Sequence, residues 1–249
     1  MMYEWKKAIV VGASSGIGEA LARKLMAQGC RVGMVARRAD RLQQIADEIN
    51  GATLNLAIPY AADVRDFEHT EEHFDNLVRE LEGLDLIIYA AGIMPKIGPT
   101  EYNTAIDKEI IEVNLIGAIA WLNCAAKRFE RAKGGTIVGI GSPSGDRGRR
   151  GNPAYSASKA GLECYLESLR NRLSQFGVSV VTVKPGPVET EMTLARGRLP
   201  GMISCDKAAT LILKAARKFG KTAYIPWKWW LASKIIQVIP SPIFRRLNV

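Results

Sequence analysis

Tyr155 and Lys159 are the side chains whose types and spacing best suit proton-transfer chemistry. Asn152 is a favourable helix N-cap and Pro153 suits the first helical position, which predicts a helix from here through Gln175. On this helix Lys159 follows Tyr155 by one turn, so its ammonium group can favour the phenolate, as does partial positive charge at the helix start. Because the free pKa of tyrosine is about 10, the pair predicts a tyrosine acidic enough to act as a general acid. A common surface pair is the alternative.

A glycine-rich turn after the first apolar run also suits a ligand. Residues 7–18 are typical of a buried strand, a turn and a helix start, and contain Gly12, Ser14, Ser15, Gly16, Ile17 and Gly18. Glycines let the backbone approach a pyrophosphate, whose charge the helix N-terminus stabilises. The spacing differs from the Gly-x-Gly-x-x-Gly of most dinucleotide-binding folds, and glycine turns also occur as simple connections. The position at the end of the first strand favours cofactor binding.

Two arginines follow the second predicted strand, 32–36, where an NAD-binding domain commonly places a carboxylate for the ribose 2′-hydroxyl. Arg37 and Arg38 instead suit a 2′-phosphate, because guanidinium groups form charge-assisted hydrogen bonds with phosphate. Asp40 lies too far into the following helix to be that carboxylate. A solvated helix start is the alternative. We expect the cofactor NADP(H) to be preferred over NAD(H).

Later apolar runs predict further strands, 57–62, 84–92, 135–142, 178–183 and 223–226, which alternate with helices at 39–50, 104–133 and 206–219. This alternation predicts an α/β fold, a single Rossmann-type doubly wound parallel sheet with helices on both faces. Ligands bind at the carboxyl edge of such sheets. The residues expected there are Asp63 and Val64 beside an adenine, the small residues Ala90, Ala91 and Gly92, and Ser142. Residues 187–204 lack periodicity, as a mobile substrate lid would.

Length and composition are consistent with one catalytic domain. The chain has 249 residues, 47% of them hydrophobic, and we expect the domain at 1–226 and an amphipathic tail at 227–249. Four scattered cysteines and no secretory signal before the first strand predict a cytoplasmic protein without structural zinc. His69 and His73 resemble half a metal site, but no third ligand is apparent, so we expect a solvated helix face and no metal.

The basic excess lies in the C-terminal part of the chain. Residues 207–249 contain nine of the 34 Lys and Arg residues and none of the 25 Asp and Glu residues. The segment 227–240 holds three tryptophans among lysines and isoleucines and is too short to span a membrane. This composition suits a helix that lies in a membrane surface. Arg245 and Arg246 would add attraction for anionic lipid. Packing on its own domain, on a partner subunit or over the substrate cleft is an equal alternative. No nucleic-acid-binding module accompanies the charge, so we expect no nucleic-acid partner.

Together these motifs resemble the short-chain dehydrogenase/reductase family over about residues 7–225. The resemblance rests on the order and spacing of the glycine turn, Ala90-Ala91-Gly92, Asn114, Ser142 thirteen residues before Tyr155, Tyr155-x-x-x-Lys159, and Pro185-Gly186. It implies an oxidoreductase that transfers hydride between a nicotinamide and a carbonyl or alcohol compound. It also implies a homo-dimer or homo-tetramer, as relatives often are.

Carried onto matching positions, the resemblance implies a role for each residue. Tyr155 would donate and accept the proton, Lys159 would hold the nicotinamide ribose and lower the tyrosine's pKa, and Ser142 would bind the substrate carbonyl oxygen. Asn114 would use its main chain to hold a water that links Lys159 to solvent. The remaining matches are contacts to the cofactor: Val188 and Thr190 with the carboxamide, Asp63 and Val64 with the adenine, and Arg37 with the phosphate.

Two positions depart from the family pattern, Val11 where threonine is usual and Tyr89 where asparagine is usual. Both changes remove a polar anchor near the glycine turn or the central strand and leave the four catalytic positions intact. A catalytically silent nucleotide-binding regulatory or scaffold protein is the main alternative function, and a sugar-nucleotide epimerase or dehydratase would need a longer C-terminal region. Arg147, Arg149 and Arg150 could attract an anionic substrate, although we expect a solvated basic loop.

Overall fold

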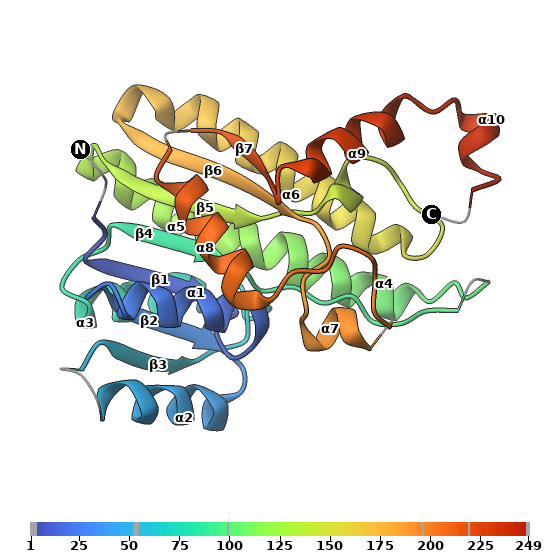
Figure 1. Ribbon diagram of the computed structural model, residues 1–249. Helices are drawn as coiled ribbons and strands as arrows, with labels where there is room; N and C mark the ends of the chain where they lie inside the picture. Colours follow the sequence, from blue (N-terminus) through green and yellow to red (C-terminus); the bar gives the residue numbers. More distant parts are fainter. Residues whose placement is uncertain (1–3, 52–54, 99, 196, 219, 248–249) are drawn as a thin grey trace.

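A seven-stranded parallel sheet organises the molecule (Figure 1). The computed structural model describes residues 4–51, 55–98, 100–195, 197–218 and 220–247. The strands lie side by side in the order β3-β2-β1-β4-β5-β6-β7. Their bounds are β1 Lys7–Val11, β2 Arg31–Ala36, β3 Ala57–Ala61, β4 Leu86–Tyr89, β5 Gly135–Ile140, β6 Val178–Pro185 and β7 Thr222–Ile225. This topology confirms the predicted Rossmann-type fold.

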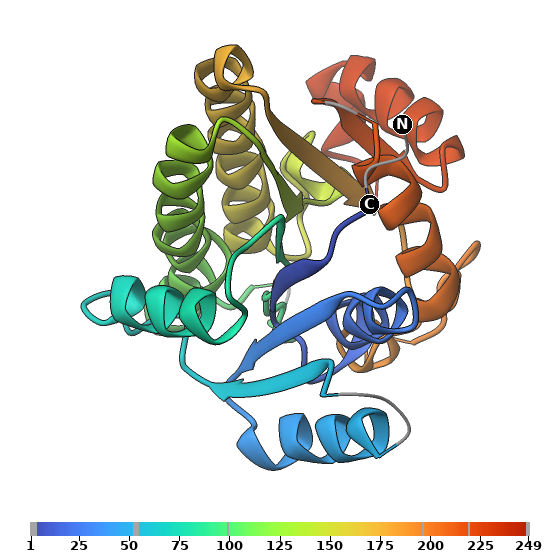
Figure 2. The same ribbon diagram turned by 90° about the vertical axis from the view of Figure 1, so that its left-hand side faces the viewer.

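Helices cover both faces of the sheet, as the end-on view shows (Figure 2). One face carries α1 (Gly16–Met26), α2 (Ala39–Asn50) and α8 (Cys205–Ala216), and the other carries α3 (Thr70–Glu80), α5 (Gly117–Ala132) and α6 (Pro153–Leu173). The short helix α7 (Glu191–Leu194) lies within the predicted lid, and α9 (Lys228–Val238) and α10 (Ser241–Phe244) form the tail.

The strands alternate their side chains between two hydrophobic cores, because successive residues of a strand point to opposite faces. On β1, Ala8 and Val10 pack with α1, α2 and α8, whereas Ile9 and Val11 pack with α3, α5 and α6. A strand buried on both faces must be apolar throughout, which explains the continuous apolar runs of the sequence.

The helix predicted at 104–133 is interrupted. It consists of α4 (Thr104–Ile111), a π-helical turn (Glu112–Ile116) and α5, and Asn114 lies in the π turn. Tyr89, at the end of β4, donates a 2.6 Å hydrogen bond from its hydroxyl group to the Val113 carbonyl. A Cβ at Gly117 would lie 2.7 Å from the Tyr89 oxygen, so the tyrosine and the glycine are fitted to each other. The departure at Tyr89 therefore supplies a new polar anchor for this turn.

By length and composition, the stretch Thr104–Ala132 could also cross a membrane, with 56% of its most apolar window buried in the fold. Here it acts as a core helix, because Trp121, Leu122 and Phe129 are fully buried against the sheet and α3.

Candidate active site

A cavity of about 910 Å³ opens at the carboxyl edge of the sheet, at the point where the strand order reverses between β1 and β4. Nearly all the residues predicted from the sequence line it: Gly12, Ser14, Ser15, Gly16, Ile17, Gly18, Arg37, Arg38, Val64, Ala90, Ala91, Gly92, Ser142, Tyr155, Lys159, Pro185, Gly186, Val188 and Thr190. Asn114 and Asp63 are not part of the lining. The sheet thus brings segments far apart in the sequence to one ligand-sized space.

The glycine turn has the close backbone packing that a pyrophosphate site requires. A Cβ at Gly12, whose φ is +90°, would lie 2.5 Å from the Ala91 nitrogen, and a Cβ at Gly18 would lie 2.0 Å from the Gly12 carbonyl oxygen. Only glycine is tolerated at either position. Ser15 caps α1 without a side-chain hydrogen bond to the helix. The first N–H groups of α1 therefore have no side-chain cap, which suits the pyrophosphate of a dinucleotide.

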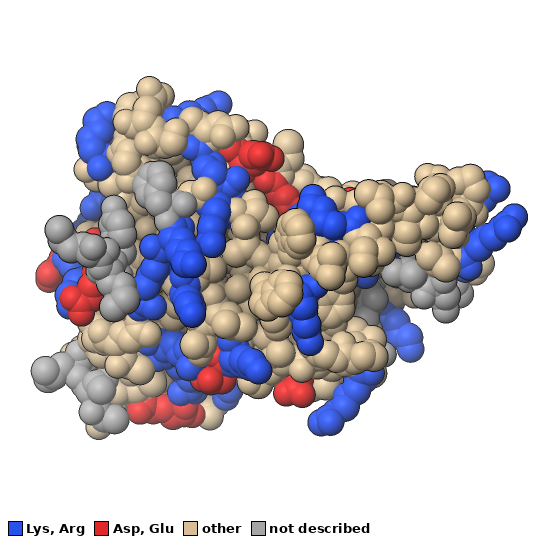
Figure 3. Space-filling model, turned by 45° about the horizontal axis from the view of Figure 1, so that its top comes forward, with Lys and Arg blue, Asp and Glu red and all other residues tan. Residues whose placement is uncertain are grey.

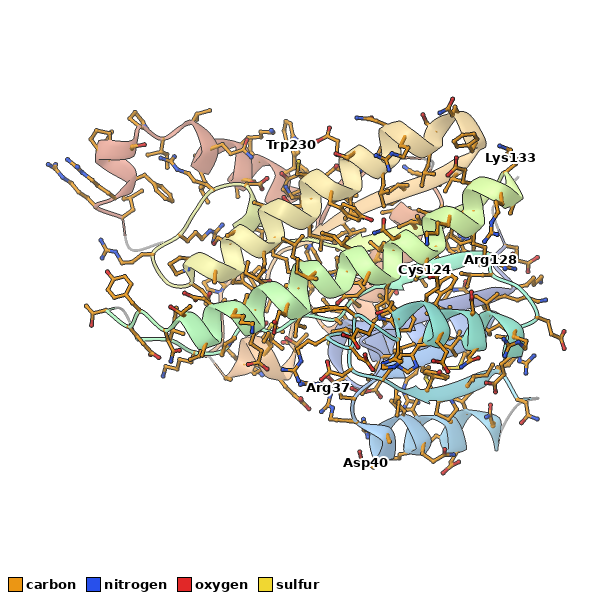
Figure 4. All side chains as sticks on the ribbon, turned by 180° about the vertical axis from the view of Figure 1, so that it is seen from behind. Arg37, Asp40, Cys124, Arg128, Lys133 and Trp230 are labelled. Atoms are coloured by element: carbon orange, nitrogen blue, oxygen red, sulfur yellow. The ribbon has the colours of Figure 1, made fainter. Side chains whose placement is uncertain are left out.

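The two arginines after β2 both reach the cavity wall. Arg38 donates hydrogen bonds to the hydroxyl oxygens of Ser14, at 3.2 Å, and Ser15, at 2.6 Å, and is thereby held beside the glycine turn. Arg37 is half exposed, with a guanidinium nitrogen 3.9 Å from the Asp63 carboxylate. Figure 4 shows Arg37 near the sheet edge and Asp40 at the start of α2.

The Asp63 carboxylate is already bound by Arg65, whose Nη2 lies 2.6 Å from it, and this pairing lowers the pKa of Asp63. Its side chain therefore belongs to an ion pair beside the cavity. The predicted adenine contact of Asp63 stays a prediction, whereas its neighbour Val64 is part of the cavity wall.

Helix α6 carries the proposed acid and its lysine. The helix begins as expected, because the Asn152 side chain accepts a 3.0 Å hydrogen bond from the Tyr155 N–H. Lys159 is buried, its Nζ lies 5.7 Å from the centre of the Tyr155 ring, and it donates a 2.8 Å hydrogen bond to the Ile140 carbonyl. Burial lowers the pKa of Lys159 to about 8, and the charge of Glu163 opposes that shift. The ammonium group is thus placed close to the phenol and shielded from bulk water.

Asn114 uses its side chain to fix the chain that follows β4. Its Oδ1 accepts a hydrogen bond from the Ile93 N–H at 2.7 Å, and its Nδ2 donates to the Ile93 carbonyl and to the Ser158 hydroxyl. These bonds join the π turn to α6, one residue before Lys159. The predicted main-chain role of Asn114 in holding a water stays a prediction.

Ser142 is positioned by the carboxylate of Glu163, a residue that no motif in the sequence indicated. The Ser142 N–H donates a 3.0 Å hydrogen bond to Glu163, and the Ser142 hydroxyl oxygen accepts one from the Ser144 N–H. Glu163 follows Lys159 by four residues, so the face of α6 that holds Tyr155 and Lys159 extends one turn further than expected. That helical spacing was the available signal.

Lys184 joins this carboxylate to a second one. Its Nζ lies 2.7 Å from Glu163 and also donates to Asp146, which in turn accepts hydrogen bonds from Tyr224 and Ser233. Burial alone would lower the pKa of Lys184, but its bonds to both carboxylates raise it above the usual value. The network therefore ties together β6, α6, the loop after β5 and the tail helix α9.

The loop 146–150 is only in part the solvated basic loop that we expected, since Arg150 is exposed but Arg147 and Arg149 are half-buried. Arg147 donates 2.6 Å hydrogen bonds to the carbonyls of Ile236 and Ile239, and its guanidinium group stacks 3.8 Å from the Phe244 ring. Arg149 is half-buried and lines the cavity. The expectation was wrong in part because the tail folds back over this loop.

The tail also supplies cavity wall. Trp229 and Ile236 of α9 line the cavity, and a Cβ at Gly186 would lie 2.1 Å from the Trp229 indole nitrogen. Met192 and Leu199, from the predicted lid, lie in the same wall. The inner face of α9 therefore packs on its own domain, which was one of the alternatives left open.

The histidine pair makes protein contacts. His69 lies 2.8 Å from the Asp66 carboxylate, and His73 lies 3.1 Å from the Tyr60 hydroxyl. Within the part of the chain that the structure describes, no cluster of three or more His, Cys, Asp and Glu residues is placed to hold a metal ion.

Comparison with known proteins finds similarity along most of the chain. Residues 6–198 match the family described as short chain dehydrogenase. An uncharacterized oxidoreductase of Myxococcus xanthus is 34% identical over 241 residues, which cover 96% of this chain and 95% of that protein. The crystal structure of a short-chain type dehydrogenase/reductase from Mycobacterium marinum superimposes with a TM-score of 0.82 at 27% identity, covering 90% of this chain and 95% of that one.

We expect Lys159→Met to change how stability depends on pH. The pKa of Lys159 is about 8 in the folded protein and 10.5 without burial, so the folded state binds fewer protons between those values. The wild type should therefore gain stability over the variant as pH rises from 8 toward 10.5, by up to about 1.4 kcal/mol per pH unit. Urea unfolding of both proteins from pH 7 to 10 measures this difference. Lys108→Met, at an exposed lysine, should run parallel to the wild type, and a parallel curve for Lys159→Met would contradict the assignment.

Proposed function

Because this chain belongs to the short-chain dehydrogenase/reductase family, whose members are oxidoreductases with an NAD(P) cofactor, we propose that it is an NADP(H)-dependent reductase of a ketone or aldehyde, or the corresponding alcohol dehydrogenase. The observation that carries the proposal is that the glycine turn, Ser142, Tyr155 and buried Lys159 all line one cavity. The nicotinamide, when bound, supplies or receives the hydride. Every other step belongs to side chains of this chain.

In reduction, negative charge develops on the substrate oxygen, and donors fixed in advance stabilise it. Ser142 offers a hydroxyl group for this purpose. Its main-chain N–H is held by Glu163, and its hydroxyl oxygen accepts from the Ser144 N–H, so the residue is fixed in place. Tyr155 gives its proton to the same oxygen, and buried Lys159 favours the phenolate that remains. In oxidation, the same phenolate accepts the proton of the alcohol.

The proposed preference for NADP(H) is supported by the charges beside the glycine turn. Arg37 and Arg38 are both half exposed and line the cavity, so each can reach a phosphate. Carboxylates also lie near these arginines: Asp63 is bound by Arg65, and the exposed Glu191 lies 3.7 Å from Arg38. A silent nucleotide-binding protein would not need Ser142, Tyr155 and Lys159 in one cavity, which argues against that alternative.

We also propose that the outer face of the tail contacts a membrane surface. Trp227, Trp230, Leu231 and Ile235 are each at least half exposed, whereas the inner face of α9 packs on the domain. Figure 4 shows Trp230 on the outside of the molecule, and in Figure 3 the C-terminal projection is largely uncharged, with basic side chains at its far end. Exposed tryptophans beside basic residues suit anionic lipid.

We expect Tyr155→Phe to abolish carbonyl reduction and to leave NADPH binding intact, because the variant loses only the proton donor. NADPH oxidation over a panel of carbonyl compounds graded by length and charge measures the first effect, and quenching or transfer of intrinsic fluorescence on NADPH titration measures the second. Tyr102→Phe, at a side chain that is 95% exposed, should behave as the wild type. Full activity of Tyr155→Phe would overturn the assignment of the acid.

We expect a preference for NADPH over NADH of about tenfold or more in kcat/KM, since a hydrogen bond to a charged group is worth about 1.5–3 kcal/mol. Arg37→Asp should erase or reverse the preference, because the new carboxylate repels the 2′-phosphate. Arg79→Asp introduces the same charge change at an exposed site on α3 and should leave the ratio unchanged. An unchanged ratio in Arg37→Asp would place the phosphate site elsewhere.

We expect the protein to sediment with vesicles that contain anionic lipid, and less so as salt increases. The double variant Trp230→Glu, Ile235→Glu should weaken binding by tenfold or more, because each buried apolar side chain contributes about 1.5–3 kcal/mol. Tyr102→Glu serves as the control at an exposed aromatic outside the tail. Equal binding by the double variant and the wild type would remove the tail from the membrane proposal.

A further inference from the structure

Two buried hydrogen-bond donors, on residues that line the cavity, lack protein partners. Within the residues that the structure describes, the buried side-chain nitrogen and oxygen atoms without a hydrogen bond are Arg149 Nε and Trp229 Nε1. Both residues line the cavity that also contains Tyr155. Leaving a buried donor unpaired costs about 1–3 kcal/mol, more for a charged group, so two in one cavity indicate a ligand that accepts from them.

Neighbouring groups do not neutralise Arg149. The flanking arginines both donate hydrogen bonds to backbone carbonyls of the tail, Arg147 to Ile236 and Arg150 to Arg245. The nearby carboxylate of Asp146 is bound by Lys184, Tyr224 and Ser233. Burial lowers the pKa of Arg149, while the charges of Asp146 and Tyr155 oppose that shift. The guanidinium group is therefore a half-buried cation beside the proposed acid.

The indole N–H of Trp229 is fixed in place. Its nitrogen packs against the backbone of Gly186, where any Cβ would lie 2.1 Å away, so the ring cannot shift toward β6. The lining of the cavity also includes apolar side chains, among them Ile93, Met94 and Ile236. A ligand here would place one acceptor group on the donors and an apolar body along the wall.

We propose that Arg149 and Trp229 form a carboxylate-binding subsite, and that the substrate is an oxo acid, or the matching hydroxy acid, with an apolar chain. This assignment rests on the proposed oxidoreductase function and names its substrate class. A carboxylate carries one charge, which matches one guanidinium, and its planar oxygens suit the planar guanidinium fork.

Binding of a carboxylate and of its neutral isostere tests the subsite without requiring turnover. Calorimetric titrations with octanoate and with octanamide, in the presence and absence of NADP⁺, compare two ligands of the same shape that differ in charge. We expect octanoate to bind at least tenfold more tightly, with one site per chain. Arg149→Gln should make the two affinities equal, and Trp229→Phe, which keeps a ring and removes the N–H, should weaken octanoate alone.

Arg150→Gln is the matched control, because it removes the same charge from the adjacent exposed side chain and should leave the octanoate preference unchanged. Equal affinities for octanoate and octanamide in the wild type, or an undiminished preference in Arg149→Gln, would overturn the subsite. Inorganic phosphate that displaces octanoate at similar concentration would also overturn it, as an unspecific anion site. These results are independent of the Tyr155→Phe assay, so the subsite can fail while the reductase function stands, and the reverse.

Discussion

The ion network around Lys184 is the constraint on which the substrate half of the site depends. Its ammonium group is shared by Glu163 and Asp146, which reach it from α6 and from the loop after β5. A buried charge is tolerated only where it is paired and further hydrogen-bonded, and this network meets that condition with Ser142, Tyr224 and Ser233. Removing one partner would leave another charge uncompensated, so these elements hold one arrangement.

The half of the cavity that contains the glycine turn is organised by close backbone packing instead of by ion pairs. The turn after β1 packs so closely against β4 and α1 that no side chain fits at Gly12 or Gly18, and Arg38 is tied to its serines. Lys159 lies where the two halves meet, between the Ile140 carbonyl and the Tyr155 ring, and a Cβ at Gly92 would lie 3.5 Å from its Nζ. Proton chemistry is thereby positioned by helix α6 and by the ends of two strands, β4 and β5.

Local patterns in the sequence predicted the parts of the structure that depend on short-range chemistry. The Asn152 cap, the spacing of Tyr155 and Lys159, and the continuous apolar strands each follow from neighbouring residues. The π turn escaped prediction because it depends on Tyr89, whose hydroxyl meets it across the fold. The basic loop was misjudged for the same reason, since Arg147 is bound by tail carbonyls about 90 residues later in the chain. Patterns along the chain do not encode such distant pairings.

The position of Trp229 in the chain has a consequence for substrate selectivity. The region matched by the family ends at residue 198, whereas this tryptophan and Ile236 belong to the segment beyond it. Substitutions in that segment remodel one wall of the cavity while Ser142, Tyr155 and Lys159 keep their places. The selectivity of the cavity and its chemistry are thus assigned to different parts of the chain, and the first can change without the second.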